Sequence, residues 1–388
     1  MLESCKRWDS ACEWNNTDVG RKRQKTMGLI IPMNMCLEEV ENRRAVNDFS
    51  VPLPSLPVFR HLEQRNGHER DTRVRFDVGP HVYYIDGKQT MGSVTRFVHE
   101  YSQEFEPYVV LRRMRSGRNW PRPAYLRAEP HESACKELRR AGHDRLALMV
   151  EDGLSAEIVC EAARDVISCN EQTRSAIELL SLTDVEICSR WREQADVASR
   201  HGTWMHWTFE AFLNGVRVCD DGPEMDMFKK YIDTLPGLVA YRTEWIVFAE
   251  HEDLAGCIDF VAMNEAGECE LFDWKRSNRL RERYDNPWQT MKPPFGHLPD
   301  CRGQEYRLQL NMYRWILCTY YNLKVAAMRV VCAHPDNGEH VFVDDVPVFL
   351  EMDDIMRERR ARVMNCKAMV EEDSYAGASR ATPTTWTT

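Results

Sequence analysis

The most regular pattern of hydrophobic and polar positions lies between residues 241 and 277. Three runs rich in Val, Ile, Phe and Trp follow one another there with polar turns between them, which predicts three consecutive β-strands. An Asn-Glu-Ala-Gly turn at 264–267 indicates that the last two strands form a hairpin. A three-residue loop in this turn sets a register that places Asp259 opposite Asp273.

The predicted hairpin brings like charges together. Cross-strand partners have Cβ atoms about 5 Å apart, and two carboxylates at that distance repel each other. Lys275 follows Asp273 by two residues, so both side chains leave the same face of the strand. A divalent cation such as Mg²⁺ or Mn²⁺ would relieve the repulsion and could polarise a phosphodiester, while the lysine stabilises developing negative charge. The alternative is an exposed hairpin whose charged side chains are simply solvated.

A helix is predicted upstream of the hairpin, over residues 201–213, with Thr203 as its N-cap. His206 and Glu210 are four residues apart and share one face of it. A lone histidine on a helix is more often structural, but this one precedes the acidic hairpin, as the helix of a metal site would. Glu244, in the first strand, is a further candidate ligand or water-orienting base.

A long connection follows the hairpin over residues 276–303 and contains several arginines, among them Arg276 and Arg279, together with Trp288. Arginines interleaved with aromatic residues suit a single nucleic-acid strand, because the cations neutralise phosphates and the rings stack on bases. A disordered insertion is the alternative, since long loops inside a compact domain are either functional or disordered.

Helical patterns flank this region on both sides. Ser93 is expected to cap a short helix that includes Thr95, and a helix N-terminus offers free N–H groups to a phosphate; a cap with no further role is the alternative. Downstream, a helix is predicted over 304–321, with Gln309 and Tyr313 on one face. Two further strands are expected at 325–333 and 340–346, and a charged helix at 352–370.

These elements predict an α/β (α+β) fold with a mixed β-sheet flanked by helices. We expect order to begin near Val74 and a disordered end from Ser374. The predicted organisation has five segments: 1–70, weakly structured; 71–130, a strand-hairpin and helix module; 131–195, a helical elaboration; 196–350, the core; and 351–388, a C-terminal helix and disordered tail.

Composition narrows the functional classes. The chain has 388 residues and no apolar run of the ~20 residues that a membrane span needs, so we expect no membrane partner. Its 14 cysteines form no C-x-x-C pair and the N-terminus has no secretory pattern, which favours a reduced intracellular protein in the nucleus or cytoplasm. A basic run at 21–25 is either a nuclear-import signal or a solvated tail. The net charge of −10 argues against indiscriminate nucleic-acid binding but permits a local basic groove.

The order of the short motifs resembles the PD-(D/E)xK nuclease superfamily, and within it the RecB-like branch that includes phage lambda-type and mitochondrial genome maintenance exonucleases. The similarity covers about residues 200 to 335, and the helix start at 92–95 resembles an upstream helix in some of these enzymes. The motifs are, in order, Gly202-Thr-x-x-His206, Glu244, Gly256-x-x-Asp259, Asp273-x-Lys275 and Gln309-x-x-x-Tyr313.

The resemblance implies a restriction-endonuclease-like core and a set of roles. His206, Asp259 and Asp273 would hold Mg²⁺ or Mn²⁺ together with the carbonyl of Trp274. Lys275 would be the catalytic lysine and Glu244 an accessory acid. The residues expected to orient the site or contact DNA are Gln309, Tyr313, Arg276, Arg279, Ser93 and Thr95.

Two departures from the family pattern are visible. The second acid is Asp273 rather than the commoner Glu. Some RecB-like relatives carry an iron–sulfur cluster on closely spaced cysteines, whereas Cys301, Cys318, Cys332 and Cys366 are scattered, so we expect no iron–sulfur cluster.

The expected function is a metal-dependent DNA nuclease, an exonuclease acting on single-stranded or frayed ends in DNA repair, recombination or replication. Three alternatives remain open: a single-strand or structure-specific endonuclease, a catalytically silent nucleic-acid-binding module, and a metal-dependent hydrolase of another substrate.

Overall fold

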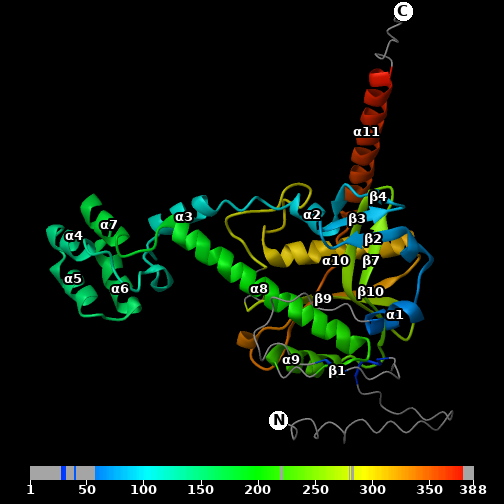
Figure 1. Ribbon diagram of the computed structural model, residues 1–388, viewed down its shortest axis with the longest axis horizontal. Helices are drawn as coiled ribbons and strands as arrows, with labels where there is room; N and C mark the ends of the chain where they lie inside the picture. Colours follow the sequence, from blue (N-terminus) through cyan, green and yellow to red (C-terminus); the bar gives the residue numbers. More distant parts are fainter. Residues whose placement is uncertain are drawn as a thin grey trace, which may run out of the picture.

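A six-stranded mixed β-sheet flanked by helices forms the centre of this computed structural model, as the α/β expectation requires (Figure 1). The structure describes residues 28–31, 39–40, 57–218, 222–278, 280 and 284–378. The strands run in the order β11-β10-β9-β8-β5, and β7 pairs with β8. Their bounds are β5 Gly92–Ser93, β7 Val239–Ala249, β8 Leu254–Met263, β9 Cys269–Lys275, β10 Val325–Cys332 and β11 Phe342–Asp345.

The predicted hairpin register is confirmed. β8 and β9 are antiparallel with Phe260 opposite Phe272, which is the predicted register; the ladder ends there, and Asp259 and Asp273 are the next residues along the two strands. The Asn264 N–H donates to the Glu268 carbonyl at 2.9 Å, which closes a three-residue loop. A one-residue slip would have sent one carboxylate to the opposite face of the sheet.

β8 has an opening along one edge. β7 pairs with the whole length of the other edge, whereas on this edge β5 pairs at 254–255 and β9 pairs at 260–263. Between them, residues 256–259 have no ladder partner on this edge within the described chain, although 256–258 pair with β7 on the other edge. Asp259 therefore lies where β8 separates from its neighbours on this edge.

Two hydrophobic clusters cover the two faces of the sheet. One joins the sheet to α2 (Val94–His99) and α10 (Arg302–Tyr320). The other joins it to α1 (His61–Arg65), α9 (Pro223–Ile232) and the C-terminal part of α8 (Asp184–Leu213). Because α10 connects β9 to β10, those two strands are parallel, as such a crossover allows.

α8 is a single 30-residue helix, and this corrects the predicted start near Thr203. A capping box between Thr183 and Glu186 begins it, and the Thr203 hydroxyl donates to the Ser199 carbonyl one turn earlier, as an interior residue does. No proline interrupts the sequence between these points. The predicted segment boundary at 195/196 consequently falls inside a helix.

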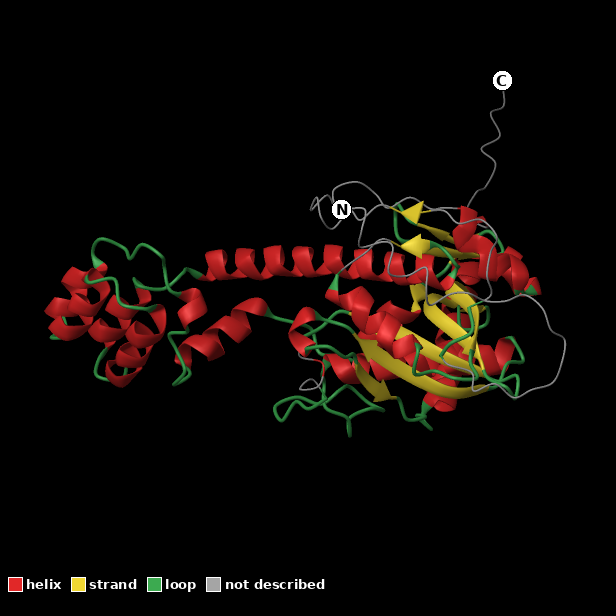
Figure 2. Cartoon of the chain, turned by 90° about the horizontal axis from the view of Figure 1, so that it is seen from below, coloured by secondary structure: helices red, strands yellow, loops and turns green. Residues whose placement is uncertain are grey.

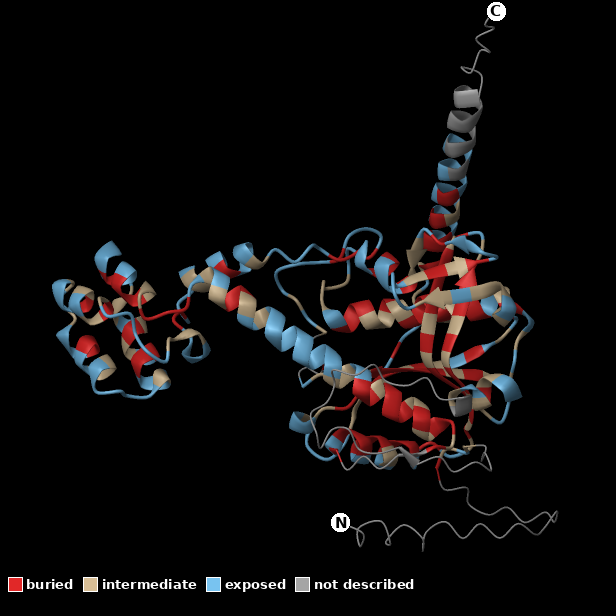
Figure 3. Cartoon of the chain, viewed as in Figure 1, coloured by how far each residue is buried: buried red, intermediate tan, exposed pale blue. Residues whose placement is uncertain are grey.

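A helical lobe lies at the far end of α8 from the sheet (Figure 2). Its helices pack around a hydrophobic cluster of their own, as the helical prediction for 131–195 requires. Residues 192–200, in the middle of α8, are exposed on the way to the sheet (Figure 3). The lobe and its approach comprise α3 Pro107–Ser116, η5 Pro123–Tyr125, α4 Ala134–Arg140, α5 Asp144–Glu151, α6 Ala156–Val166 and α7 Glu171–Glu178.

The ends of the chain depart from expectation. Among the described residues, regular structure is already present before Val74: β1 is a strand at Glu39–Val40, and helical structure runs from Pro57, where Leu62 is fully buried and Arg70 stacks on Phe248. The C-terminal helix α11 (Met352–Ala378) extends past Ser374. The remaining elements are η3 Pro57–Arg60, η4 Glu69–Arg73, η7 Pro335–Asn337, the sheet of β2 Val74–Asp77, β3 Val82–Ile85 and β4 Lys88–Gln89, and the pair β1 Glu39–Val40 and β6 Arg217–Val218.

Candidate functional site

α8 and the two long strands bring three potential ligands together. His206, Glu244 and Asp259 each offer one ligand atom, and these atoms lie within 4.8 Å of one another. The His206 Nδ1 atom is 3.7 Å from Asp259 Oδ2 and 3.9 Å from Glu244 Oε1. His206 and Asp259, which are 53 positions apart in the sequence, thus lie close together at the opening along β8.

The two carboxylates control the ionisation of the histidine. Burial disfavours the charged imidazolium, but Asp259 and Glu244 outweigh it and raise the pKa of His206 to about 9. The ring therefore carries a proton at neutral pH when no other cation is present. A divalent ion bound by these groups would replace that proton as the neutralising charge.

Glu244 has an uncommon backbone conformation. Its φ of 43° lies in the left-handed region, which costs a non-glycine residue about 1–3 kcal/mol. β7 pairs Thr243 with Phe260 and Trp245 with Ile258, so Glu244 stands opposite Asp259. The strained backbone of Glu244 therefore lies where the Glu244 carboxylate approaches His206. With Asp273 beyond Asp259, three acidic residues form a row across β7, β8 and β9.

Asp273 is the most buried acid of the row, with 2% of its surface exposed. Its Oδ1 atom accepts from Lys275 Nζ at 2.7 Å, whereas its buried Oδ2 has no hydrogen-bond partner among the described residues. Burial raises the pKa of Asp273 to about 6; Lys275 opposes this shift and Asp259 adds to it. The orphaned oxygen is a group that a cation could satisfy, because buried polar atoms are otherwise nearly always paired.

Lys275 is held as a cation. Burial would lower its pKa, but Asp273 and Asp259 outweigh burial and raise the pKa above the ordinary value. Its ammonium also lies 4.9 Å from the centre of the Tyr306 ring, on α10. A lysine fixed in this way supplies a positive charge rather than a base.

Trp274 contributes through its backbone. Its N–H donates to Asp259 Oδ2 at 2.8 Å and so fixes the carboxylate against β9. Its ring is buried in the core with Phe209 and Phe260. The ligand role of its carbonyl stays a prediction.

Gln309 and Tyr313 do lie together on α10, joined by a 3.3 Å hydrogen bond between Gln309 Nε2 and the Tyr313 hydroxyl. Tyr313 is 2% exposed and packs against Gly256 on β8. Of the two roles implied for it, this burial favours orienting the site over contact with a DNA backbone.

The remaining predicted contacts lie at the periphery. Ser93 caps α2 by accepting from the Arg96 N–H, and Thr95 is exposed on its first turn. Arg276 donates from its Nε atom to Glu224 Oε1 at 2.8 Å, and Glu224, on α9, is 2% exposed. Arg279 lies outside the described residues.

The sequence interpretation missed two close neighbours of the site. Cys257 donates from its thiol to Glu244 Oε2 at 3.2 Å, and burial raises its pKa. Tyr306 contacts Lys275, as noted. Spacing could have found both, since Cys257 is two residues before Asp259 on the strand and Tyr306 is three before Gln309 on the helix.

The donor set fits a hard divalent cation. Two carboxylates and an imidazole lie within one ion's reach, and a third carboxylate with a free oxygen stands beside them. Asp273 is not one of the three groups that already lie within 4.8 Å of one another. Its participation therefore rests on the register and on its unpaired oxygen.

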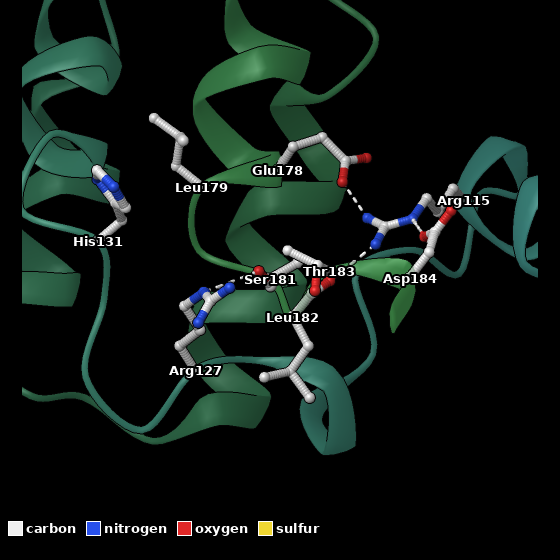
Figure 4. Close-up of a pocket in the computed structure, with 9 residues that line it drawn as sticks. All are labelled: Arg115, Arg127, His131, Glu178, Leu179, Ser181, Leu182, Thr183 and Asp184. Carbon is white, nitrogen blue, oxygen red and sulfur yellow. Dashed lines mark hydrogen bonds and ion pairs between the residues drawn. The ribbon is translucent and has the colours of Figure 1, made fainter. Parts of the chain in front are cut away.

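A hollow lies away from this site, between the lobe and the start of α8 (Figure 4). Its arginines are already paired: Arg115 with Glu178 and Asp184, and Arg127 with Glu186. It lies about 33 Å along α8 from His206. These pairs fasten the lobe to the helix.

Comparisons with known proteins leave the function open. No protein-family model and no curated protein matches the chain. Sixteen chains of solved structures match, among them the crystal structure of SSO0001, at 16% identity over 46% of this chain and 69% of that one, with a TM-score of 0.23. A TM-score this low does not establish a shared fold. Within the described residues, no helix has the length and apolarity to cross a membrane.

Proposed function

We propose that the protein is a metal-dependent nuclease that hydrolyses DNA phosphodiester bonds. One observation carries this proposal: the acidic row of Glu244, Asp259 and Asp273, with His206 at one end and Lys275 at the other. Structural ion pairs perturb pKa values too, but they leave few buried carboxylate oxygens unpaired.

The roles of the residues follow from their positions. His206, Asp259 and Asp273 would hold Mg²⁺ or Mn²⁺, which supplies positive charge against the phosphate when bound. Lys275 is fixed by Asp273 at 2.7 Å and stabilises negative charge as water attacks phosphorus and the P–O ester bond breaks. Glu244, half-exposed beside them, is the group available to orient the water.

The fold class supports a restriction-endonuclease-like core. An antiparallel hairpin bears the acids and the lysine, and a crossover helix leads from it to a parallel strand. A helix on the opposite face supplies the histidine. These features agree with the motif order that resembles PD-(D/E)xK nucleases, in which the similar residues have the same roles.

For the substrate we propose single-stranded or frayed DNA ends. The connection between β9 and α10 begins after Lys275 and ends at the start of α10, about one helical turn before Tyr306, which contacts Lys275. A structure at that place would obstruct an uninterrupted duplex more than a single strand. The net charge of −10 also favours a narrow track over a broad basic face.

A digestion panel tests the proposal: linear and circular, single- and double-stranded DNA, and RNA, each with Mg²⁺ or EDTA. Divalent-dependent cleavage of DNA that Lys275→Ala abolishes is the expected result. Binding without cleavage would indicate a silent nucleic-acid-binding module. Neither binding nor cleavage of any nucleic acid would refute the proposal and leave a hydrolase of another substrate.

A further inference from the structure

Trp288 is the most exposed tryptophan among the described residues, with 86% of its surface accessible. Trp120, Trp204, Trp245 and Trp274 are, by contrast, buried in the core. Burying an indole ring stabilises a protein strongly, and an exposed ring does not contribute this stabilisation. An exposed tryptophan on a well-anchored backbone therefore indicates a binding surface.

The backbone around Trp288 is held in place. Its N–H donates to Asn286 Oδ1 at 3.2 Å, and the Asn286 amide donates to the Asp300 carbonyl at 2.6 Å. The Asp300 N–H in turn donates to the Gln289 carbonyl at 2.9 Å. Trp288 therefore stands at the base of a small hairpin rather than at a loose loop tip.

This hairpin, residues 286–300, is anchored to the rest of the protein. Phe295 is fully buried and packs edge-on against Tyr101, just after α2. The Lys292 N–H donates to the Tyr101 carbonyl at 2.7 Å, and the Gln103 N–H donates to Asp300 Oδ2 at 2.7 Å. The expected alternative of a disordered insertion is wrong for this half of the connection.

A cation accompanies the exposed ring. The Lys292 ammonium donates to the Glu100 carbonyl at 3.3 Å, and within the described chain no ion pair neutralises its charge. An exposed aromatic ring and an uncompensated cation on one rigid hairpin are the two elements with which proteins bind single-stranded nucleic acid.

We propose that the 286–300 hairpin is a single-strand grip, in which Trp288 stacks on an unpaired nucleobase and Lys292 contacts the adjoining phosphate. This inference rests on the proposed function and deepens it by assigning the group that recognises the unpaired strand. The hairpin is joined to the site through α10: Asp300 precedes that helix by two residues, and Tyr306, which contacts Lys275, lies about 6 Å along it from Arg302.

The test is a double-mutant cycle on binding, measured in Ca²⁺ to prevent turnover. Wild type and Trp288→Ala are each titrated with a single-stranded oligonucleotide and with the same strand containing abasic positions. Stacking predicts that Trp288→Ala weakens binding of the intact strand about 5- to 150-fold and has no effect on the abasic strand. Trp288→Phe should retain most of the affinity.

Leu350→Ala is the matched control, because Leu350 is 87% exposed and not aromatic; it should leave both affinities unchanged. If Trp288→Ala binds both strands as wild type does while DNA is still cleaved, the grip is refuted and the nuclease proposal stands. If it weakens both strands equally, the ring does not stack on a base and the grip is likewise refuted. If wild type neither binds nor cleaves nucleic acid, both proposals fail.

Discussion

Gly256 lies directly against the ring of Tyr313. A Cβ atom at Gly256 would stand 2.8 Å from Tyr313 Cε1 and 2.9 Å from its hydroxyl, closer than such atoms approach in real structures. Val94 blocks the same space from α2, with its Cγ2 atom at 2.9 Å. Because Gly256 has no side chain, α10 can lie close to β8 beside the opening that holds Asp259.

Gly256→Ala should consequently destabilise the protein by about 1–3 kcal/mol, because Tyr313 and Val94 must both move. Gly202→Ala is the matched control: it lies inside α8 with nothing within 4 Å of the added methyl group, and should stabilise by up to about 1 kcal/mol. Urea denaturation of the two variants measures both. Equal effects of the same sign would show that the Gly256 contact does not exist.

Lys275→Ala should abolish cleavage while DNA affinity stays within a few fold, because the lysine stabilises charge in the reaction rather than anchoring the strand. Lys324→Ala is the control. Lys324 is exposed and pairs with Glu268 at the turn end of the same hairpin, so this variant should cleave normally. Single-turnover cleavage and binding in Ca²⁺ separate the two effects. Wild-type turnover by Lys275→Ala would remove this residue from the mechanism.

Asp259→Asn should eliminate the response of the protein's stability to Mg²⁺. The substitution removes the charge of the carboxylate that lies beside His206, while the amide oxygen can still accept from the Trp274 N–H, so the local structure is kept. Wild type should gain about 2.7 kcal/mol at a Mg²⁺ concentration of 100 Kd. Thermal melts with and without Mg²⁺ measure this, with exposed Asp152→Asn as the charge control. An unchanged Mg²⁺ shift in Asp259→Asn would place the cation elsewhere.

We expect the enzyme to require a free DNA end. A covalently closed single-stranded circle should resist digestion, while its linearised form is degraded under the same conditions. The connection beside the site and its anchored hairpin are the features that favour threading of an end. Equal rates on circle and linear strand, at equal nucleotide concentration, would identify an endonuclease.

Acid stability should depend on Asp71. Burial would raise its pKa, but hydrogen bonds from the buried Arg242, from the His68 backbone and from Trp245 outweigh burial and lower it. The unfolded value is 3.8, so this stabilisation is fully present above about pH 4 and is lost as pH falls through the lower folded pKa.

Asp71→Asn leaves Arg242 as an uncompensated buried charge and should cost about 3–5 kcal/mol at pH 7. Its stability should also fall less steeply than that of wild type below pH 4. Urea titrations at pH 7, 4 and 3 test both statements. A wild-type acid slope in the variant would mean that another carboxylate controls this range.

Local pattern was enough to predict the hairpin and the register of its strands. The turn at 264–267 fixes the loop length, and with a period of two that alone puts Asp259 opposite Asp273 and Lys275 on the same face. The same is true of the helix bearing Gln309 and Tyr313, whose spacing brings them into contact. These relationships span few residues, so the geometry of one element or one turn determines them.

Other features depend on contacts between distant segments. Periodicity could not show that α8 runs unbroken past residue 203, since its exposed middle has no apolar face to mark it. The left-handed backbone of Glu244, the unpaired Asp273 oxygen and the anchoring of residues 286–300 on Tyr101 likewise have no local signal. Each arises because packing fixes a group whose own sequence neighbours would allow several conformations. The sequence by itself determined which residues could share a site, and only the tertiary structure decided how closely they meet.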